Sequence, residues 1–506
     1  MPAKPDKPTS EEKSPPARKR AGRVTKAGKG TPAKYEPGEA VPPSPPASPA
    51  GTVSGFDPAA VAEAHGLYRH NRKDGAYYLR APDGEFIALC WREVKQLLRG
   101  AVRQKPQEGE IDSESDRLQK HVLFHRRVDC VLDGLAGHRP GRYTFEGISF
   151  LVTKAPRLIE PAEGHFPLIE KFIAELLPDT GDGVLQWLLF CGWLKTAVEA
   201  VRAGAQRAGQ LLILCGKADD GKSRLQHFLI TPALGGRHAP PGKYLLGDTQ
   251  FNSEMFAAEH LLMEDPASGL KKEDRQKFKQ NLKGVAVNDS APYHEKGRPA
   301  ITLAPVWRLS LSLNDGPDDL AILPPPSVDF GEKTIMLRTS RPSCLPGASE
   351  EERKQFRDTI RAELPAFLFF LLNGLDCLLT PALRGSRFFV RSYENPTIRE
   401  AMEEETPHFQ LLEMLDAAQP WLKSEKGFWI GKASALRAVL EDDGDTSDDF
   451  GRWQKHNNLV RCLGRLRQDR PGRVSYVHHG DGGKWKVWPP EKPTSATPDT
   501  SSADEI

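Results

Sequence analysis

The chain has few cysteines, and their spacing fits neither a metal site nor a disulfide framework. The seven cysteines include no C-x-x-C pair and no grouped histidine ligands, which argues against zinc and against a secreted disulfide-rich protein. They lie at positions 90, 130, 191, 215, 344, 377 and 462. We therefore expect reduced thiols in a cytoplasmic protein.

Long apolar runs and a strong charge imbalance are also missing. The longest apolar stretches, such as residues 366–372, are too short to cross a bilayer, and the N-terminus has no apolar signal core. We expect no membrane partner. The formal net charge is only +2, so the distribution of charge is more informative about nucleic-acid binding than the total. A length of 506 residues favours several domains.

A glycine-rich segment in the middle of the chain predicts a phosphate-binding P-loop. The apolar run Leu211–Cys215 is typical of a buried strand, and apolar residues at helical spacing follow the motif G-K-A-D-D-G-K-S. In such a loop, backbone N–H groups and the helix N-terminus bind phosphate, Lys222 adds a charge, and Ser223 offers a hydroxyl to Mg²⁺. The residues predicted to bind ATP are Gly216, Lys217, Ala218, Asp219, Asp220, Gly221, Lys222 and Ser223. We expect the Asp219 and Asp220 side chains to face solvent.

Two later strands end in polar residues that suit an ATPase. Residues 261–265 form an apolar run that ends in Glu264 and Asp265. An ATPase needs one carboxylate to hold Mg²⁺ and another to orient or deprotonate the attacking water, and either residue could take either role. The alternating residues 307–313 end in Asn314. At the tip of a strand beside the P-loop strand, Asn314 could sense the γ-phosphate and position water.

A lysine-rich helix and a projecting hairpin are predicted between these two strands. Lysines and arginines recur from 271 to 283, and turn residues follow in a segment that contains His294, Lys296 and Arg298. A basic finger of this kind can grip a phosphate backbone without reading sequence. The alternative is a solvated helix face followed by a surface loop.

Composition divides the rest of the chain into two tails and two flanking regions. Residues 1–54, which are rich in Pro and Lys, and residues 491–506 are expected to be disordered, and the basic cluster near residue 20 either contacts nucleic acid or is simply solvated. Residues 55–180 predict a small α+β N-terminal domain without a catalytic constellation, including a hairpin at 76–89.

The region 396–490 predicts helices followed by a β-wing, as in a winged-helix-like DNA-binding domain. Its last helix carries Arg461 and Arg465, which are the candidates to face DNA. A small domain with a solvated basic helix is the alternative.

The order of the central motifs resembles that of superfamily 3 helicases. The P-loop, the strand ending in Glu264 and Asp265, the Lys296 loop and the strand ending in Asn314 follow one another within residues 211–314. The closer similarity is to the phage and mobile-element primase-helicase branch, and it covers roughly residues 205–340. The segments that carry this closer similarity are Ala208–Gln210, Phe251–Ser253, Glu259–His260, Lys296–Arg298, Trp307–Ser310 and Asn314–Asp315.

The resemblance implies an α/β fold with an AAA+-like P-loop ATPase core over residues 181–385. It further implies an ATP-dependent replicative DNA helicase of a mobile element or prophage, a magnesium-dependent hydrolase that forms a hexameric ring and moves single-stranded DNA through a central channel. The implied partners are single-stranded and fork DNA, further copies of the chain, and a primase or other replication proteins.

The resemblance also assigns roles to residues. Lys222 and Ser223 bind phosphates and Mg²⁺, and the implied metal ligands are Ser223, Glu264 and Asp265. Asn314 is the sensor, and Lys296 with His294 lies on a DNA-contacting hairpin.

Ring ATPases of this family also take an arginine finger from a neighbouring subunit, but residues 315–331 contain no arginine. We favour Arg338 over Lys333 for this role.

Two other functions remain open from the residues. One is a non-motor DNA-binding replication initiator whose ATP site controls assembly, which the unclear arginine finger makes plausible. The other is a small-molecule kinase, which is disfavoured because a kinase has no obvious use for a lysine-bearing hairpin between the acidic strand and the strand ending in Asn314.

Overall fold

The computed structural model describes most of the chain between residues 56 and 490. The described ranges are 56–72, 75–179, 181–264, 272–287, 290–297, 300–324, 328–404, 407–442, 456–479 and 482–490. Both predicted tails, Asp265 and Arg298 lie outside them, so the predictions for these residues stay predictions. Across the described ranges, no helix has the length and apolar character needed to span a membrane.

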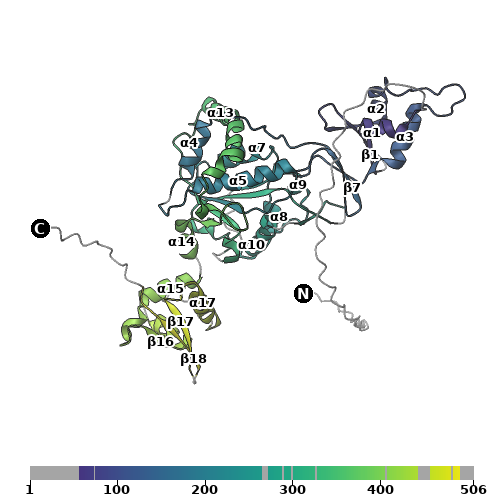
Figure 1. The fold of residues 1–506 in the computed structure, drawn as a ribbon. Coiled ribbons are helices and arrows are strands. Elements are labelled where there is room, and N and C mark those ends of the chain that lie inside the picture. Colours follow the sequence, from purple (N-terminus) through teal and green to yellow (C-terminus); the bar gives the residue numbers. More distant parts are fainter. Residues whose placement is uncertain are drawn as a thin grey trace, which may run out of the picture. The chain divides into compact units, whose positions relative to one another are not determined.

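The fold is a mixed α/β structure around a six-stranded parallel sheet (Figure 1). The strand order is β15-β14-β8-β13-β10-β9, and every adjacent pair runs parallel. The strands are β8 (Leu211–Cys215), β9 (His238–Ala239), β10 (His260–Glu264), β13 (Arg308–Leu313), β14 (Thr334–Arg338) and β15 (Tyr393–Glu394). The predicted P-loop strand is therefore confirmed as β8, and the predicted strand before Asn314 is its neighbour β13.

Helices cover both faces of this sheet, as the alternation of side chains along a strand requires. Leu212 and Leu214 of β8 point into one apolar cluster with α4, α5 and α13, while Leu211 and Ile213 point into a second cluster with α10. Figure 1 shows α5 and α13 on one side of the sheet and α8 and α10 on the other. The helices of these layers are α4 (Pro167–Leu176), α5 (Gln186–Ala203), α8 (Gly242–Leu246), α9 (Ser253–Phe256), α10 (Lys272–Val287), α11 (Pro317–Leu320), α12 (Val328–Gly331) and α13 (Glu350–Phe369), with the short turns η2 (Phe370–Gly374), η3 (Leu375–Cys377) and η4 (Pro381–Leu383).

The helix after the P-loop is less regular than its sequence pattern suggests. It begins as α6 (Lys222–Arg224), widens into the π-helical turn η1 (Leu225–Ile230), and ends as α7 (Thr231–Ala233). Single π-helical turns occur often at functional sites because they change the direction in which side chains project.

The predicted hairpin between α10 and β13 is confirmed. Strands β11 (Ala291–Tyr293) and β12 (Ile301–Leu303) pair antiparallel, with Tyr293 opposite Ile301. Residues His294–Gly297 therefore belong to the connection at the far end of the hairpin, where Gly297 has a positive φ of 82°.

The N-terminal region contains two small sheets. The first has the order β3-β2-β1-β4, and its β2–β3 pair confirms the hairpin predicted at 76–89; the second has the order β5-β7-β6. The elements are α1 (Pro58–Ala64), β1 (Tyr68–His70), β2 (Tyr77–Arg80), β3 (Phe86–Leu89), α2 (Trp91–Leu97), α3 (Glu114–His125), β4 (Arg127–Val128), β5 (Cys130–Leu132), β6 (Gly141–Phe145) and β7 (Ile148–Val152).

The C-terminal region has its own apolar core, which includes Leu415, Leu436, Leu463 and Val487. Three helices pack with an antiparallel sheet of order β16-β18-β17, and β16 is a strand that the sequence analysis did not anticipate. The elements are α15 (Pro407–Ala418), η5 (Pro420–Lys423), β16 (Trp429–Gly431), α16 (Ala433–Asp442), α17 (His456–Asp469), β17 (Val474–His479) and β18 (Gly482–Val487). The preceding helix α14 (Pro396–Glu404) instead contributes Ile398 and Met402 to the core of the central sheet.

Candidate nucleotide-binding site

The carboxyl ends of four parallel strands bring the predicted ATPase residues to one edge of the sheet. β8 leads into the P-loop, and β14 and β13 flank it on either side. β13 ends before Asn314, and β10, the next strand beyond β13, ends in Glu264. Ligands of open parallel sheets bind at this edge. The sequence motifs that lie far apart along the chain thus converge on one place.

The conformation of the P-loop requires glycine at two positions. Gly221 has a φ of 100°, which side chains other than hydrogen rarely permit. At Gly216, an added Cβ would lie 2.1 Å from Thr339 Oγ1 and 2.5 Å from Asp220 Oδ2. The loop is therefore packed against the segment that follows β14, with no room for a larger residue at its start.

The side chain of Lys222, at the start of the P-loop helix, points back into the loop. Its side chain is buried, and Nζ donates to the carbonyl oxygens of Gly216 at 2.8 Å and Lys217 at 2.7 Å. Ser223 is exposed at the first turn of the helix. An ammonium group inside the loop and an exposed hydroxyl next to it fit a polyphosphate with Mg²⁺.

The expectation that both aspartates of the loop face solvent is wrong for Asp220. Asp219 is exposed and has a φ of 62°, but Asp220 is only 5% exposed. The Thr339 hydroxyl donates to Asp220 Oδ2 at 3.1 Å and lies 3.3 Å from the carbonyl oxygen of Cys215. Asp220 thus turns away from the anion-binding side of the loop and holds the loop to the end of β14.

Arg338 and Arg341 lie on the same segment after β14. The backbone of Arg338 is fixed by the buried side chain of Gln186, which accepts from Arg338 N at 2.8 Å and donates to Arg338 O at 3.1 Å, while the Arg338 side chain is exposed. Arg338 is in register with Cys215, the last residue before the chain's own P-loop. Arg341 Nη1 donates to the carbonyl oxygen of Asp219 at 2.9 Å.

Three arginines lie close enough beside the loop to influence one another, and the charge of Asp219 opposes theirs. Partial burial lowers the pKa of Arg224, and the nearby charges of Arg341 and Arg353 lower it further. These arginines come from the P-loop helix, the segment after β14 and helix α13. An anion bound beside the loop would offset their mutual repulsion. Sequence analysis missed this cluster because its members lie on three separate elements.

Glu264 lies at the end of β10 with its side chain 37% exposed, and His227 Nε2 is 3.4 Å from Glu264 Oε1. Asn314 is half-buried directly after β13.

Ser223 and Glu264 offer the oxygen ligands that Mg²⁺ prefers, so the described part of the predicted metal site fits that ion. In the described ranges, no group of three His, Cys, Asp or Glu side chains is arranged to hold a metal ion.

A buried polar network connects the P-loop helix to β10 and β13. His260 is fully buried, with Nδ1 2.7 Å from Thr231 Oγ1 and Nε2 2.7 Å from Ser310 Oγ. Gln226 Nε2 also donates to Ser310 Oγ, at 2.8 Å. Burial lowers the pKa of His260 to about 3, so this imidazole is neutral and acts as a structural connector.

Asn252 anchors the predicted DNA-contacting hairpin near its turn, where strand β11 ends. The buried Asn252 donates from Nδ2 to Pro292 O at 2.6 Å, and its Oδ1 accepts from His294 N at 2.8 Å. The ring of Phe251 packs edge-on against that of His294, with centroids 5.0 Å apart. Lys296 is exposed to solvent two residues after His294.

In the C-terminal region, Arg461 and Arg465 are exposed on α17, while Leu459, Leu463 and Leu466 of the same helix are buried. Arg465 Nε is 3.7 Å from Asp469 Oδ2. Helix α17 thus has an exposed polar face and a buried apolar face. This pattern fits both interpretations of the helix, DNA contact and solvation.

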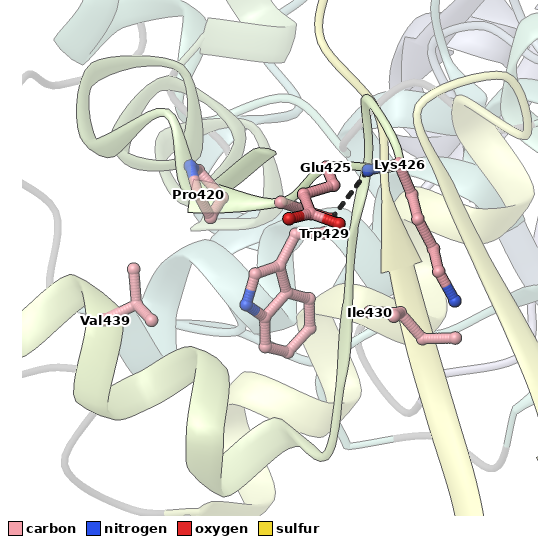
Figure 2. Close-up of a pocket in the computed structure, with 7 residues that line it drawn as sticks. Pro420, Glu425, Lys426, Trp429, Ile430 and Val439 are labelled. Atoms are coloured by element: carbon pink, nitrogen blue, oxygen red, sulfur yellow. Dashed lines mark hydrogen bonds between the residues drawn. The ribbon is translucent and has the colours of Figure 1, made fainter. Parts of the chain in front are cut away.

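A cavity of about 410 Å³ lies in the same region, around Trp429 (Figure 2). Its lining residues are Pro420, Ser424, Glu425, Lys426, Trp429, Ile430 and Val439. Among these residues, Lys426 N donates to Ser424 Oγ at 3.3 Å. None of the predicted site residues lines this cavity, so it is separate from the nucleotide site.

Comparisons with known proteins give only distant likenesses. No family model and no curated protein matches the chain. Among solved structures, the C-terminal region of NrS-1 (residues 305–718) is similar over 85% of this chain and 98% of that chain, with 12% identity and a TM-score of 0.49. The active helicase Cch of SCCmec type IV is similar over 81% and 78% of the two chains, with 12% identity and a TM-score of 0.27. The JCV helicase is similar over 50% and 70%, with 15% identity and a TM-score of 0.20. At this distance none of them assigns a function to the chain.

Proposed function

We propose that the chain is an ATP-dependent DNA helicase, acting as the replicative helicase of a mobile element or prophage in a hexameric ring on single-stranded DNA. The observation that carries this proposal is the convergence of the P-loop, Glu264 and Asn314 on one sheet edge, with the Lys296 hairpin inserted between β10 and β13. A nucleotide site and a movable cation on adjoining strands are what a translocating ATPase needs.

Each residue of the site has a role in this proposal. Lys222 neutralises the β/γ-phosphates, and Asn314 senses the γ-phosphate from the strand beside the loop. Glu264, together with Asp265, would hold the metal and orient the attacking water. A Mg²⁺ ion bound by Ser223 and the acidic residues would neutralise charge that develops on the phosphate oxygens.

The hairpin would couple hydrolysis to movement along DNA. Lys296 lies at its exposed end, and His294 lies where Asn252 anchors the hairpin to the segment before β10. A movement of the segment before β10 can therefore reach the hairpin through Asn252. Arg298 would add a second cation to this end, and Arg461 and Arg465 would hold fork DNA.

A second candidate function is a non-motor initiator whose ATP site controls assembly. The position of Arg338 favours it, because Arg338 lies beside its own P-loop and is therefore less suited to reach a neighbouring subunit. In that case ATP binding would stabilise an oligomer on DNA without repeated turnover.

The test is ATP hydrolysis by the full chain with and without single-stranded DNA. Wild type is expected to be stimulated by DNA, and Lys222→Ala is expected to lose turnover by at least about a hundredfold, because the phosphates lose a full charge. Lys296→Ala should keep its DNA-free turnover but lose stimulation. Lys354→Ala, which removes an exposed lysine of α13, is the matched control and should behave as wild type.

Two other outcomes would lead to different conclusions. Turnover that ignores DNA, or nucleotide binding without turnover, would support the assembly function. Nucleotide binding that is unchanged in Lys222→Ala would reject the ATP site itself.

A further inference from the structure

The contact between His227 and Glu264 joins two parts of the proposed ATPase site that are distant in sequence. Nε2 of His227 lies 3.4 Å from Oε1 of Glu264, and both side chains are about one-third exposed. Within the described ranges, His227 is the one Lys, Arg or His side chain that lies within ion-pairing distance of the Glu264 carboxylate. A glutamate at a strand end has several rotamers, so a single partner strongly influences which oxygen faces the nucleotide.

His227 comes from the P-loop helix itself. It lies four residues after Ser223, about one turn along, and falls within the π-helical turn η1. The wider turn shifts its side chain relative to a regular α-helix, which a sequence pattern does not reveal. The same helix therefore carries the phosphate lysine at its start and the partner of the acidic residue one turn later.

The surroundings of His227 hold it in place. The rings of His227 and His238 pack edge to face with centroids 5.4 Å apart. Burial lowers the pKa of His238, as does the nearby charge of His227. The hydrogen bonds of the buried His260 network fix the P-loop helix, which carries His227, to β10 and β13.

We propose that His227 is a positioning residue that holds Glu264 Oε1 and thereby directs the other carboxylate oxygen towards the water that attacks ATP. This inference rests on the proposed ATPase function and adds a residue that no motif indicated. The P-loop helix thus sets both the position of the phosphates and the orientation of the acid that acts on them. Misorienting that acid should slow hydrolysis without weakening ATP binding.

Two amide substitutions test the inference. The amide nitrogen of glutamine can reach the position of His227 Nε2, whereas that of asparagine reaches only the position of Nδ1. His227→Asn is therefore expected to lower kcat about tenfold with KM for ATP within about twofold, and His227→Gln to retain most of the activity. His165→Gln, a change of an exposed histidine outside the proposed site, is the control and should leave kcat unchanged.

Equal activity of the Gln and Asn variants, or an effect on KM alone, would overturn the inference. A second measurement needs no turnover: unfolding temperatures of His227→Asn, Glu264→Gln and the double variant. If the two side chains are paired, each substitution should lower the unfolding temperature less when the other residue has already been replaced. Additive losses of unfolding temperature would overturn the pairing. A wild-type chain that binds ATP without hydrolysing it would reject the ATPase proposal, while this cycle would still decide whether His227 holds Glu264.

Discussion

At the scale of single residues, a buried carboxylate lies inside a loop that is proposed to bind an anion. Asp220 does not oppose that role, because its side chain is turned to Thr339 and away from the loop's open side. The same contact explains why position 216 must be glycine, since an added Cβ would lie 2.5 Å from Asp220 Oδ2. The Thr339 hydroxyl thus packs against the loop at both Asp220 and Gly216.

Thr339→Val is expected to destabilise the protein by about 1–3 kcal/mol, because it keeps the shape of the side chain but leaves the Asp220 carboxylate without its hydroxyl donor. Calorimetric unfolding measures the loss. Thr339→Ser keeps the hydroxyl and should lie within about 0.5 kcal/mol of wild type. A valine variant as stable as the serine variant would show that the contact contributes nothing.

At the scale of elements, the hairpin β11–β12 depends on a residue outside it. Three hydrogen bonds join Asn252 to the strand β11 and its end: Nδ2 to Pro292 O, Oδ1 from His294 N, and Asn252 N to His294 O at 3.1 Å. Asn252 directly precedes α9, which leads to β10. The hairpin is therefore tied to the strand that carries Glu264.

Asn252→Ala is expected to loosen the turn end of the hairpin, because two side-chain hydrogen bonds are lost. Hydrogen exchange of residues 291–297 should become faster, and DNA stimulation of ATP hydrolysis should fall several-fold while DNA-free turnover stays within about twofold. Asn281→Ala removes a comparable amide, one that donates to Tyr244 O and Leu245 O, and is the control. Unchanged exchange in the hairpin would contradict the prediction.

At the scale of the whole molecule, the position of Arg338 bears on how the subunits of the proposed ring would share ATP sites. β14 places Arg338 beside the P-loop of its own chain, in register with Cys215, and Gln186 fixes its backbone. Arg341 is likewise bound to its own loop, at Asp219. The backbone of Arg338 and the side chain of Arg341 are thus both held at the P-loop of their own chain.

Mixing two inactive variants tests this arrangement. If Arg338 acts within its own subunit, oligomers mixed from Arg338→Ala and Lys222→Ala chains should stay inactive, because no subunit has both groups. If Arg338 acts across an interface, some sites in the mixture recombine an intact P-loop with an intact arginine, and hydrolysis should recover to roughly a quarter of wild type. We expect no recovery in an ATPase assay of the mixture.

Much of the central fold could be predicted from local pattern. The five buried residues of β8, the glycine motif after it and the turn residues near 290 each indicate their own structure, because strand burial, glycine conformation and turn chemistry depend on near neighbours. The π-helical turn η1 and the short strand β16 were missed, since neither has a distinctive local pattern.

Residue types and motif order were thus sufficient to identify Lys222, Glu264 and Asn314 as candidates and to expect them at one sheet edge. Only the tertiary structure decided how these groups are held: Asp220 by Thr339, Arg338 by Gln186, His294 by Asn252, and Glu264 by His227. Each of these partners lies between 37 and 152 positions away along the chain. Contacts of such long range depend on strand order and helix packing, which arise from the burial of the whole sheet and leave no local signal in the sequence.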